Sequence, residues 1–101
     1  MTDKARTAAM PDVPTSAEVG LPDLLSGVWY AMVGPPKLKP QLQDQIAKAT
    51  IEVLKMSDVQ QRFRALHVEP DGRTPAETAA FITDEARRRG KVIRANHIMA
   101  E

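Results

Sequence analysis

The sequence predicts an α/β segment that is mostly α-helical, with one or two short strands. Three stretches carry helical periodicity or a helix-start motif, and one apolar stretch is typical of a buried strand. The composition is ordinary for a globular protein, with 43% hydrophobic and 27% charged residues. A chain of 101 residues is long enough for one small domain.

The first 25 residues are predicted to form a loop that holds a short helix. Residues 15–18 match a capping box, in which the Thr15 hydroxyl accepts from the Glu18 N–H and the Glu18 carboxylate accepts from the Thr15 N–H. Gly20 can adopt the left-handed conformation that ends a helix, and Pro22 prevents its continuation. One or two helical turns are therefore expected here.

Residues 26–33, Ser-Gly-Val-Trp-Tyr-Ala-Met-Val, predict a strand buried on both faces. The run is mostly apolar, is too short for a helix of average length, and ends at Gly34-Pro35-Pro36. One strand cannot pair with itself, so its N–H and C=O groups need neighbours that this chain barely supplies. The segment is therefore expected to pair with the rest of a larger protein or with another copy.

Two helices are predicted between Lys39 and about residue 66. The first runs to about Met56, and its apolar positions recur at spacings of four, three and four: Leu42, Ile46, Ala49 and Val53. Residues 57–60 match a second capping box that opens the shorter helix. The expected buried side of this second helix is Val59, Phe63 and Leu66.

The strongest local signal is the third capping box, Thr74-Pro75-Ala76-Glu77, which also has proline at the first helical position. It follows residues 68–70, a candidate for a very short strand, and a turn at Asp71-Gly72. The helix is expected to end near Ala95 or Asn96. Its expected buried residues are Phe81, Ile82, the Arg89 methylenes and Ile93.

The sequence contains no convincing catalytic, metal or cofactor constellation, so a non-enzymatic protein without a cofactor is expected. Cysteine is absent, and His67 and His97 lie 30 residues apart, with no second ligand at helical spacing. No run approaches the roughly 20 apolar residues that span a bilayer. No apolar segment follows Met1, so no signal peptide is expected in this chain.

The single charge run, residues 87–91, allows two interpretations. A nucleic-acid or anionic-surface contact is one, but flanking aromatics are lacking and the net charge is only +1. The favoured one is a solvated helix face, on which Asp84 and Glu85 form intrahelical ion pairs with the arginines at 87–89. No nucleic-acid partner is expected.

Taken in order, these motifs resemble the C-terminal third of the tripartite tricarboxylate transporter substrate-binding receptors. The resemblance covers essentially the whole chain. The matching residues are Met10-Pro11-Asp12-Val13-Pro14-Thr15, Ala17-Glu18, Gly20-Leu21-Pro22, Trp29-Tyr30, Glu69-Pro70, Thr74-Pro75-Ala76-Glu77, Phe81 and Gly90-Lys91-Val92-Ile93.

The resemblance implies the C-terminal part of a two-lobed, type II periplasmic-binding-protein-like fold. Residues 1–25 then leave the second lobe, and residues 26–101 supply a strand and three helices that pack on the first lobe. Such receptors bind tri- or dicarboxylates or related organic anions and deliver them to a membrane permease, which implies a periplasmic location. The loops that hold the carboxylate come mainly from the N-terminal part of these receptors. Trp29 and Tyr30 are the candidates in this chain for a position beside the hinge or ligand, and core positions in the strand are the alternative.

Four positions depart from the family pattern. Glycine usually follows the Trp-Tyr pair, where this chain has Ala31, and a longer loop of small residues usually stands at 34–36. Glycine also usually precedes the short strand, where this chain has His67, so strain is expected if that backbone needs a positive φ. An aromatic often stands where this chain has Arg89.

One further hypothesis belongs to another class of protein. The chain can be a free-standing helical interaction module with no ligand of its own, forming a homodimer through residues 28–33. The isolated strand motivates this alternative.

Overall fold

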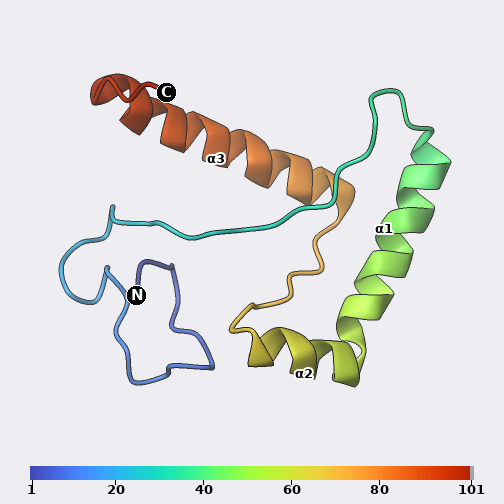
Figure 1. Ribbon diagram of the computed structural model, residues 1–101, viewed down its shortest axis with the longest axis horizontal. Helices are drawn as coiled ribbons and strands as arrows, with labels where there is room; N and C mark the ends of the chain where they lie inside the picture. Colours follow the sequence, from blue (N-terminus) through green and yellow to red (C-terminus); the bar gives the residue numbers. More distant parts are fainter. Residues whose placement is uncertain (101) are drawn as a thin grey trace.

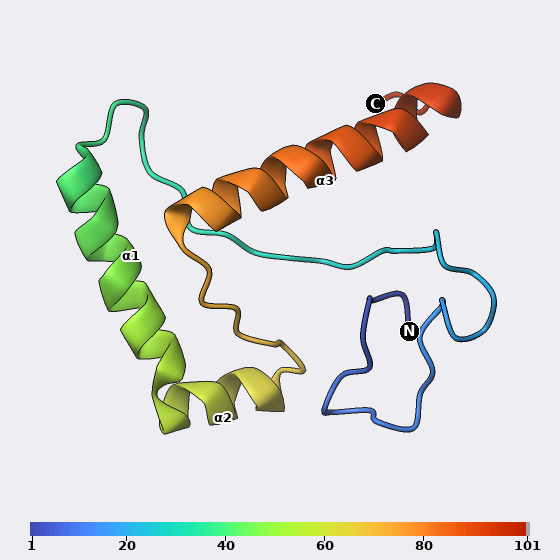
Figure 2. The same ribbon diagram turned by 180° about the vertical axis from the view of Figure 1, so that it is seen from behind.

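The structure, a computed structural model, describes residues 1–100 and contains three helices in an open frame. They are α1 (Pro40–Lys55), α2 (Ser57–Ala65) and α3 (Pro75–Ala95). The chain starts in a closed loop and runs as an extended segment alongside α3. It then turns into α1, which contacts both other helices (Figures 1 and 2).

The helix predictions agree with the structure to within about one residue at the ends that were predicted. Pro40 begins α1, and α3 ends at Ala95. The third capping box is confirmed, because the Glu77 carboxylate accepts from the Thr74 N–H at 2.8 Å and the Thr74 hydroxyl accepts from the Glu77 N–H at 3.3 Å. These bonds satisfy N–H groups that have no partner inside the helix.

The second capping box was predicted wrongly. Ser57 is already inside α2, and the residue at the N-cap is Met56, which makes no side-chain cap. The Gln60 side chain instead donates to the Leu54 carbonyl at 3.3 Å, at the end of α1. The close succession of the two helices thus moves the boundary one residue toward the N-terminus, and the serine loses the capping position.

Neither predicted strand forms within residues 1–100. Residues 26–33 are extended but unpaired, and residues 68–70 are irregular. No hydrogen bond joins the backbone of residues 28–33 to another residue of the described chain. A strand forms only when its N–H and C=O groups pair with a neighbouring strand, and the described residues supply no such neighbour.

The N-terminal loop unit, residues 1–26, folds back on itself. The Ser16 N–H donates to the Met1 carbonyl at 2.7 Å, and the Ser26 N–H donates to the Thr2 carbonyl at 2.9 Å. The predicted short helix is replaced by turns, although Gly20 has the expected positive φ of 86°. With no long apolar face to pack, a single capped turn does not extend into a helix.

Glu18 organises this loop unit through its carboxylate. It accepts from the Thr15 N–H at 2.7 Å and from the Arg6 Nη2 at 2.9 Å. These hydrogen bonds, first the one from Arg6 and then the one from Thr15, lower the pKa of Glu18 from 4.5 to about 2. The first capping box is therefore confirmed, with an arginine partner that the sequence did not indicate.

The loop unit is expected to loosen in acid. Because the pKa of Glu18 is lower when folded, its contribution to stability is complete above pH 4.5 and is lost as the pH falls toward 2. An NMR titration of the Glu18 carboxyl carbon should show this low pKa, and Arg6→Gln should move it back toward the ordinary value. A midpoint near 4.5 in the unsubstituted chain would contradict the contact.

His67 has the strained backbone that the family comparison anticipated. Its φ is 55°, in the left-handed region that favours glycine. The residue follows the end of α2, where the His67 N–H donates to the Arg64 carbonyl at 3.0 Å. A histidine here therefore carries a modest conformational cost at the exit of the helix.

The helices do not enclose a core. No hydrophobic residue of the described chain is buried, and the buried residues are Thr15 and Ser16. The accessible surface is 8716 Å², against roughly 5,700 Å² for a compact protein of this mass. The radius of gyration is 16.5 Å, against about 13 Å expected.

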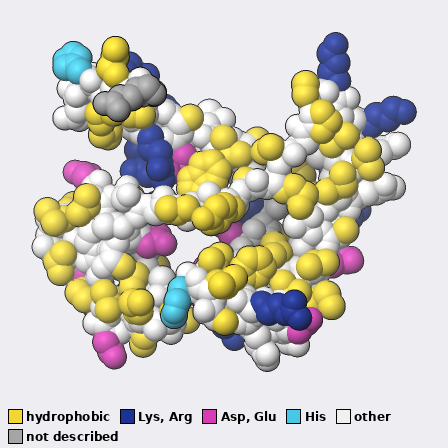
Figure 3. Space-filling view, in the orientation of Figure 1, with side chains coloured by type: hydrophobic (Ala, Val, Ile, Leu, Met, Phe, Trp, Pro, Cys, Tyr) yellow, Lys and Arg dark blue, Asp and Glu magenta, His cyan; other side chains and the backbone are white. Residues whose placement is uncertain are grey.

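The predicted apolar residues do share one face of each helix, but the prediction that these faces are buried was wrong. Leu42, Ile46 and Val53 of α1 are 44%, 42% and 48% exposed, while Phe81 and Ile82 of α3 are half-buried. Figure 3 shows hydrophobic side chains spread over α1 and over the extended segment at the centre. None of the described helices is both long and apolar enough to cross a membrane.

Candidate functional site

The two predicted site residues, Trp29 and Tyr30, lie next to each other on the extended segment but have different surroundings. The Trp29 ring packs edge-on against Phe81 of α3, with ring centroids 5.3 Å apart and planes at 76°. Trp29 is 39% exposed and Tyr30 is 86% exposed. Neighbouring side chains of an extended chain point to opposite sides, so contact with α3 leaves Tyr30 in the open.

Phe81 is the centre of this contact. On it also lies the guanidinium of Arg73, 4.5 Å from the ring centroid. Such a cation over an aromatic face is held by the ring quadrupole. The Arg73 Nε is in turn 2.6 Å from a carboxylate oxygen of Asp71, so the turn before α3 is fastened to the helix that it precedes.

An open hollow of about 630 Å³ lies beside Phe81. Its lining residues are Asp71, Gly72, Arg73, Glu77, Ala80, Phe81 and Asp84. Three of these are carboxylates, and the single cation is already paired with one of them. A hollow with this charge repels an organic anion, so its electrostatics do not suit a carboxylate ligand.

The charged run on α3 forms the predicted intrahelical pairs. Arg87 pairs with Asp84, and the Glu85 carboxylate lies 2.9 Å from both the Arg88 Nη2 and the Arg89 Nε. The prediction of a solvated face was wrong for Glu85 and its two arginine partners. The Glu85 side chain is only 13% exposed, against 59% for Asp84.

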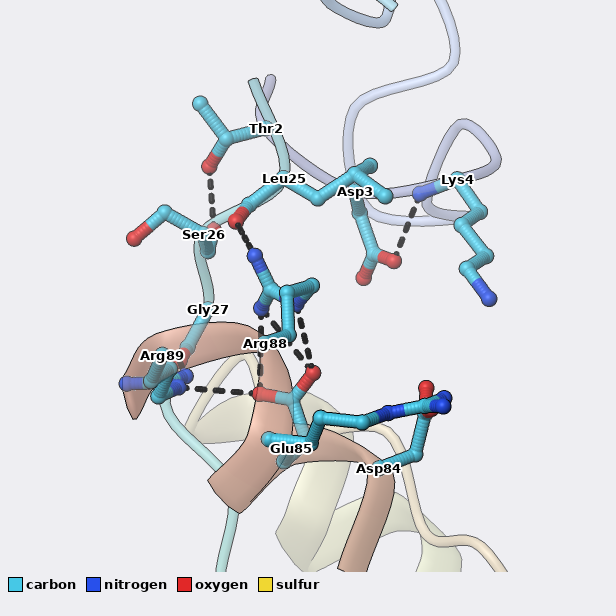
Figure 4. A network of polar contacts seen from close by, with 11 residues as sticks. Thr2, Asp3, Lys4, Leu25, Ser26, Gly27, Asp84, Glu85, Arg88 and Arg89 are labelled. Carbon is cyan, nitrogen blue, oxygen red and sulfur yellow. Dashed lines mark hydrogen bonds and ion pairs between the residues drawn. The ribbon is translucent and has the colours of Figure 1, made fainter. Parts of the chain in front are cut away.

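Sequence reasoning missed that two of these arginines reach across the chain. The Arg88 Nη1 donates to the Leu25 carbonyl at 2.6 Å, and the Arg89 Nη2 donates to the Gly27 carbonyl at 2.7 Å (Figure 4). The acceptors are main-chain groups, which leave no trace in the residue pattern.

The histidines remain apart from this region. His67 follows α2, and His97 follows α3 with a φ of 51°. Within residues 1–100, no three His, Cys, Asp or Glu side chains gather in a way that could hold a metal ion.

Comparison with known proteins places these features in a family. Residues 1–98 match the family model described as "Tripartite tricarboxylate transporter family receptor". The chain is 33% identical over 89 residues to the protein BugT of Bordetella pertussis, which covers 88% of this chain and 27% of that protein. No solved structure matches.

A second relative comes from Agrobacterium vitis and is called "UPF0065 protein in the TAR-I ttuE-ttuC' intergenic region". It is 34% identical over 96 residues, covering 92% of this chain and 28% of the relative. The chain thus spans little more than a quarter of the length of either curated relative. The family match nevertheless extends over nearly every residue, so the chain belongs to the tripartite tricarboxylate transporter receptor family.

Proposed function

We propose that this chain is the C-terminal segment of an extracytoplasmic receptor that binds small tri- or dicarboxylates, or related organic anions, for a tripartite tricarboxylate-type transporter. The observation that carries the proposal is the family match over residues 1–98. The function is capture and delivery of a solute and not catalysis. A membrane permease receives the solute, and the receptor works in the periplasm.

The open surface supports this role as part of a larger body. The accessible surface exceeds that of a compact protein of equal mass by roughly 3,000 Å². A standard protein interface buries only about 800 Å² on each partner. The excess accessible surface is several times larger than one side of such an interface. Coverage by a continuous core, that of the first lobe of the same receptor, is therefore favoured over coverage by a separate partner.

The same features support the proposed division into lobes. Residues 1–25, which are all of the loop unit but its last residue, leave toward the second lobe, and residues 26–101 pack on the first. In this arrangement residues 28–33 become a strand of the first lobe's sheet, because their N–H and C=O groups lack partners within the described chain.

The carboxylate is held mainly by residues outside this chain. The acidic hollow beside Phe81 does not suit an anion, and the run of arginines is occupied by Glu85, Asp84 and main-chain carbonyls. Of the two candidates we propose Tyr30 for the position facing the cleft, and its exposure supports this, since Trp29 is engaged with Phe81. Both stay beside the hinge and contribute shape more than charge.

The test compares this chain alone with a chimera that joins it to the remainder of the Agrobacterium vitis relative. Calorimetric titration of citrate, succinate and malate into the chain alone should give no binding. In the chimera, one of these acids at 100 times its Kd should raise stability by about 2.7 kcal/mol, which is seen as a higher Tm.

Two results would count against the proposal. Micromolar binding of any of these acids to the chain alone would place the ligand site inside these residues. A chimera that folds cooperatively and is stabilised by none of the acids would argue against carboxylate binding. A Tyr30→Ala chimera serves as the probe of the cleft position, and Val33→Ala, on the opposite side of the same segment, is its matched control.

A further inference from the structure

The second half of α3 holds the chain at the point where the loop unit ends and the extended segment begins. Arg88 donates to the Leu25 carbonyl and Arg89 donates to the Gly27 carbonyl, across 63 and 62 residues of sequence. The two acceptors are two residues apart, and the two donors are consecutive. Two neighbouring side chains of α3 therefore bind the same short stretch of main chain through two separate hydrogen bonds.

Glu85 orients both arginines toward that stretch. Its carboxylate accepts from the Arg88 Nε at 3.0 Å and from the Arg89 Nε at 2.9 Å. Because each guanidinium is a rigid planar fork, fixing its Nε edge also fixes where its terminal N–H groups point. The side chain of Glu85 is 13% exposed, and two cations compensate the cost of removing its charge from water (Figure 4).

Within residues 1–100, no other hydrogen bond or ion pair connects the loop unit to the helices. Its remaining hydrogen bonds, such as those from Ser16 to Met1 and from Ser26 to Thr2, close it on itself. The bonds from Arg88 and Arg89 are the ones that join residues 1–27 to the rest of the described chain. The loop unit also borders His67 and Glu69 across a shared hollow, but the hydrogen bonds that attach it to the described helices are concentrated at residues 25–27.

We propose that Arg88 and Arg89, oriented by Glu85, form a pivot clamp that fixes the exit of the loop unit on α3. The clamp holds residues 25–27 in place on α3, so that residues 28–33 enter their path along the helix from a fixed point. In its reference to lobes the inference rests on the proposed function, because the loop unit leads to the second lobe. The three residues are positioning residues, and none of them contacts the ligand.

Trp29 reports on the clamp in this chain without any ligand. It is the single tryptophan, it lies two residues beyond Gly27, and it packs on Phe81 of the same helix. When the clamp holds, α3 partly shields Trp29, which is 39% exposed, from a soluble quencher. When it opens, the segment swings away and the ring is exposed.

The experiment measures acrylamide quenching of Trp29 fluorescence in the 101-residue chain, with Arg88→Ala and Glu85→Gln as test variants. Losing one hydrogen bond from a charged donor should shift the ratio of undocked to docked segment by roughly tenfold. Arg87→Ala is the matched control, because Arg87 is adjacent on α3 and pairs with Asp84 only. Circular dichroism checks that α3 keeps its helix in every variant.

Faster quenching in both test variants, with Arg87→Ala unchanged, supports the clamp. Quenching of the unsubstituted chain as fast as that of a free tryptophan analogue would overturn it, since nothing would then be docked. Equal quenching in all variants, or an equal rise in Arg87→Ala, would also overturn it. Because no carboxylate is added, this outcome is independent of whether the receptor binds one.

Discussion

Scanning calorimetry of the chain alone is expected to give an unfolding enthalpy below the roughly 70 kcal/mol of a compact domain of about 100 residues. Unfolding enthalpy and heat capacity both grow with the surface that unfolding exposes. Here no hydrophobic side chain of the described residues is fully buried, so unfolding exposes less new apolar surface than in a compact domain. The transition should be broad, and the helices should melt gradually.

The same property should make the folded chain bind the dye ANS, which reports accessible apolar surface. Exposed side chains such as Val28 at 84%, Met32 at 71% and Val33 at 77% provide that surface. A sharp transition with an enthalpy near that of a compact domain, together with weak dye binding, would contradict an open chain.

The second large effect is expected from Phe81→Ala. This substitution removes both the edge-on contact with Trp29 and the ring beneath Arg73. The contact with Trp29, worth about 0.5 to 1.5 kcal/mol, is the one of the two that holds the extended segment to α3, whereas the contact with Arg73 fastens the residues just before the helix. Trp29 quenching should therefore rise toward that of an unfolded chain.

The helix itself should survive, because alanine has the highest helix propensity and the Thr74–Glu77 cap is untouched. Tyr30→Ala is the matched control, since it removes a neighbouring aromatic ring that is 86% exposed. Unchanged quenching in Phe81→Ala, with helix content preserved, would mean that the segment does not depend on this ring.

Local features were the predictable part of this fold. The helix ends at Pro40, Pro75 and Ala95 follow from proline, capping and periodicity, which act over a few residues. The Ser57 box failed because a neighbouring helix end competes for the same position. A pattern that is local in sequence does not record such competition.

What could not be predicted depends on groups that are distant or unspecific in sequence. The strand at 26–33 has the right residues, but its formation needs partner strands that the described chain does not contain. The arginine contacts with Leu25 and Gly27 use main-chain carbonyls, which every residue possesses. Only the structure distinguishes the two site candidates, because Trp29 packs against Phe81 and Tyr30 is exposed.

The most direct test of the central claim, that the apolar segment is built to be covered by the body of a receptor, is hydrogen exchange at the amides of residues 28–33. The measurement is made in the chain alone and in the chimera with the remainder of the Agrobacterium vitis relative. We predict exchange close to that of an unstructured peptide in the chain alone and strong protection in the chimera, because the N–H groups then gain strand partners. Equally fast exchange of these amides in a chimera that unfolds cooperatively would contradict the claim.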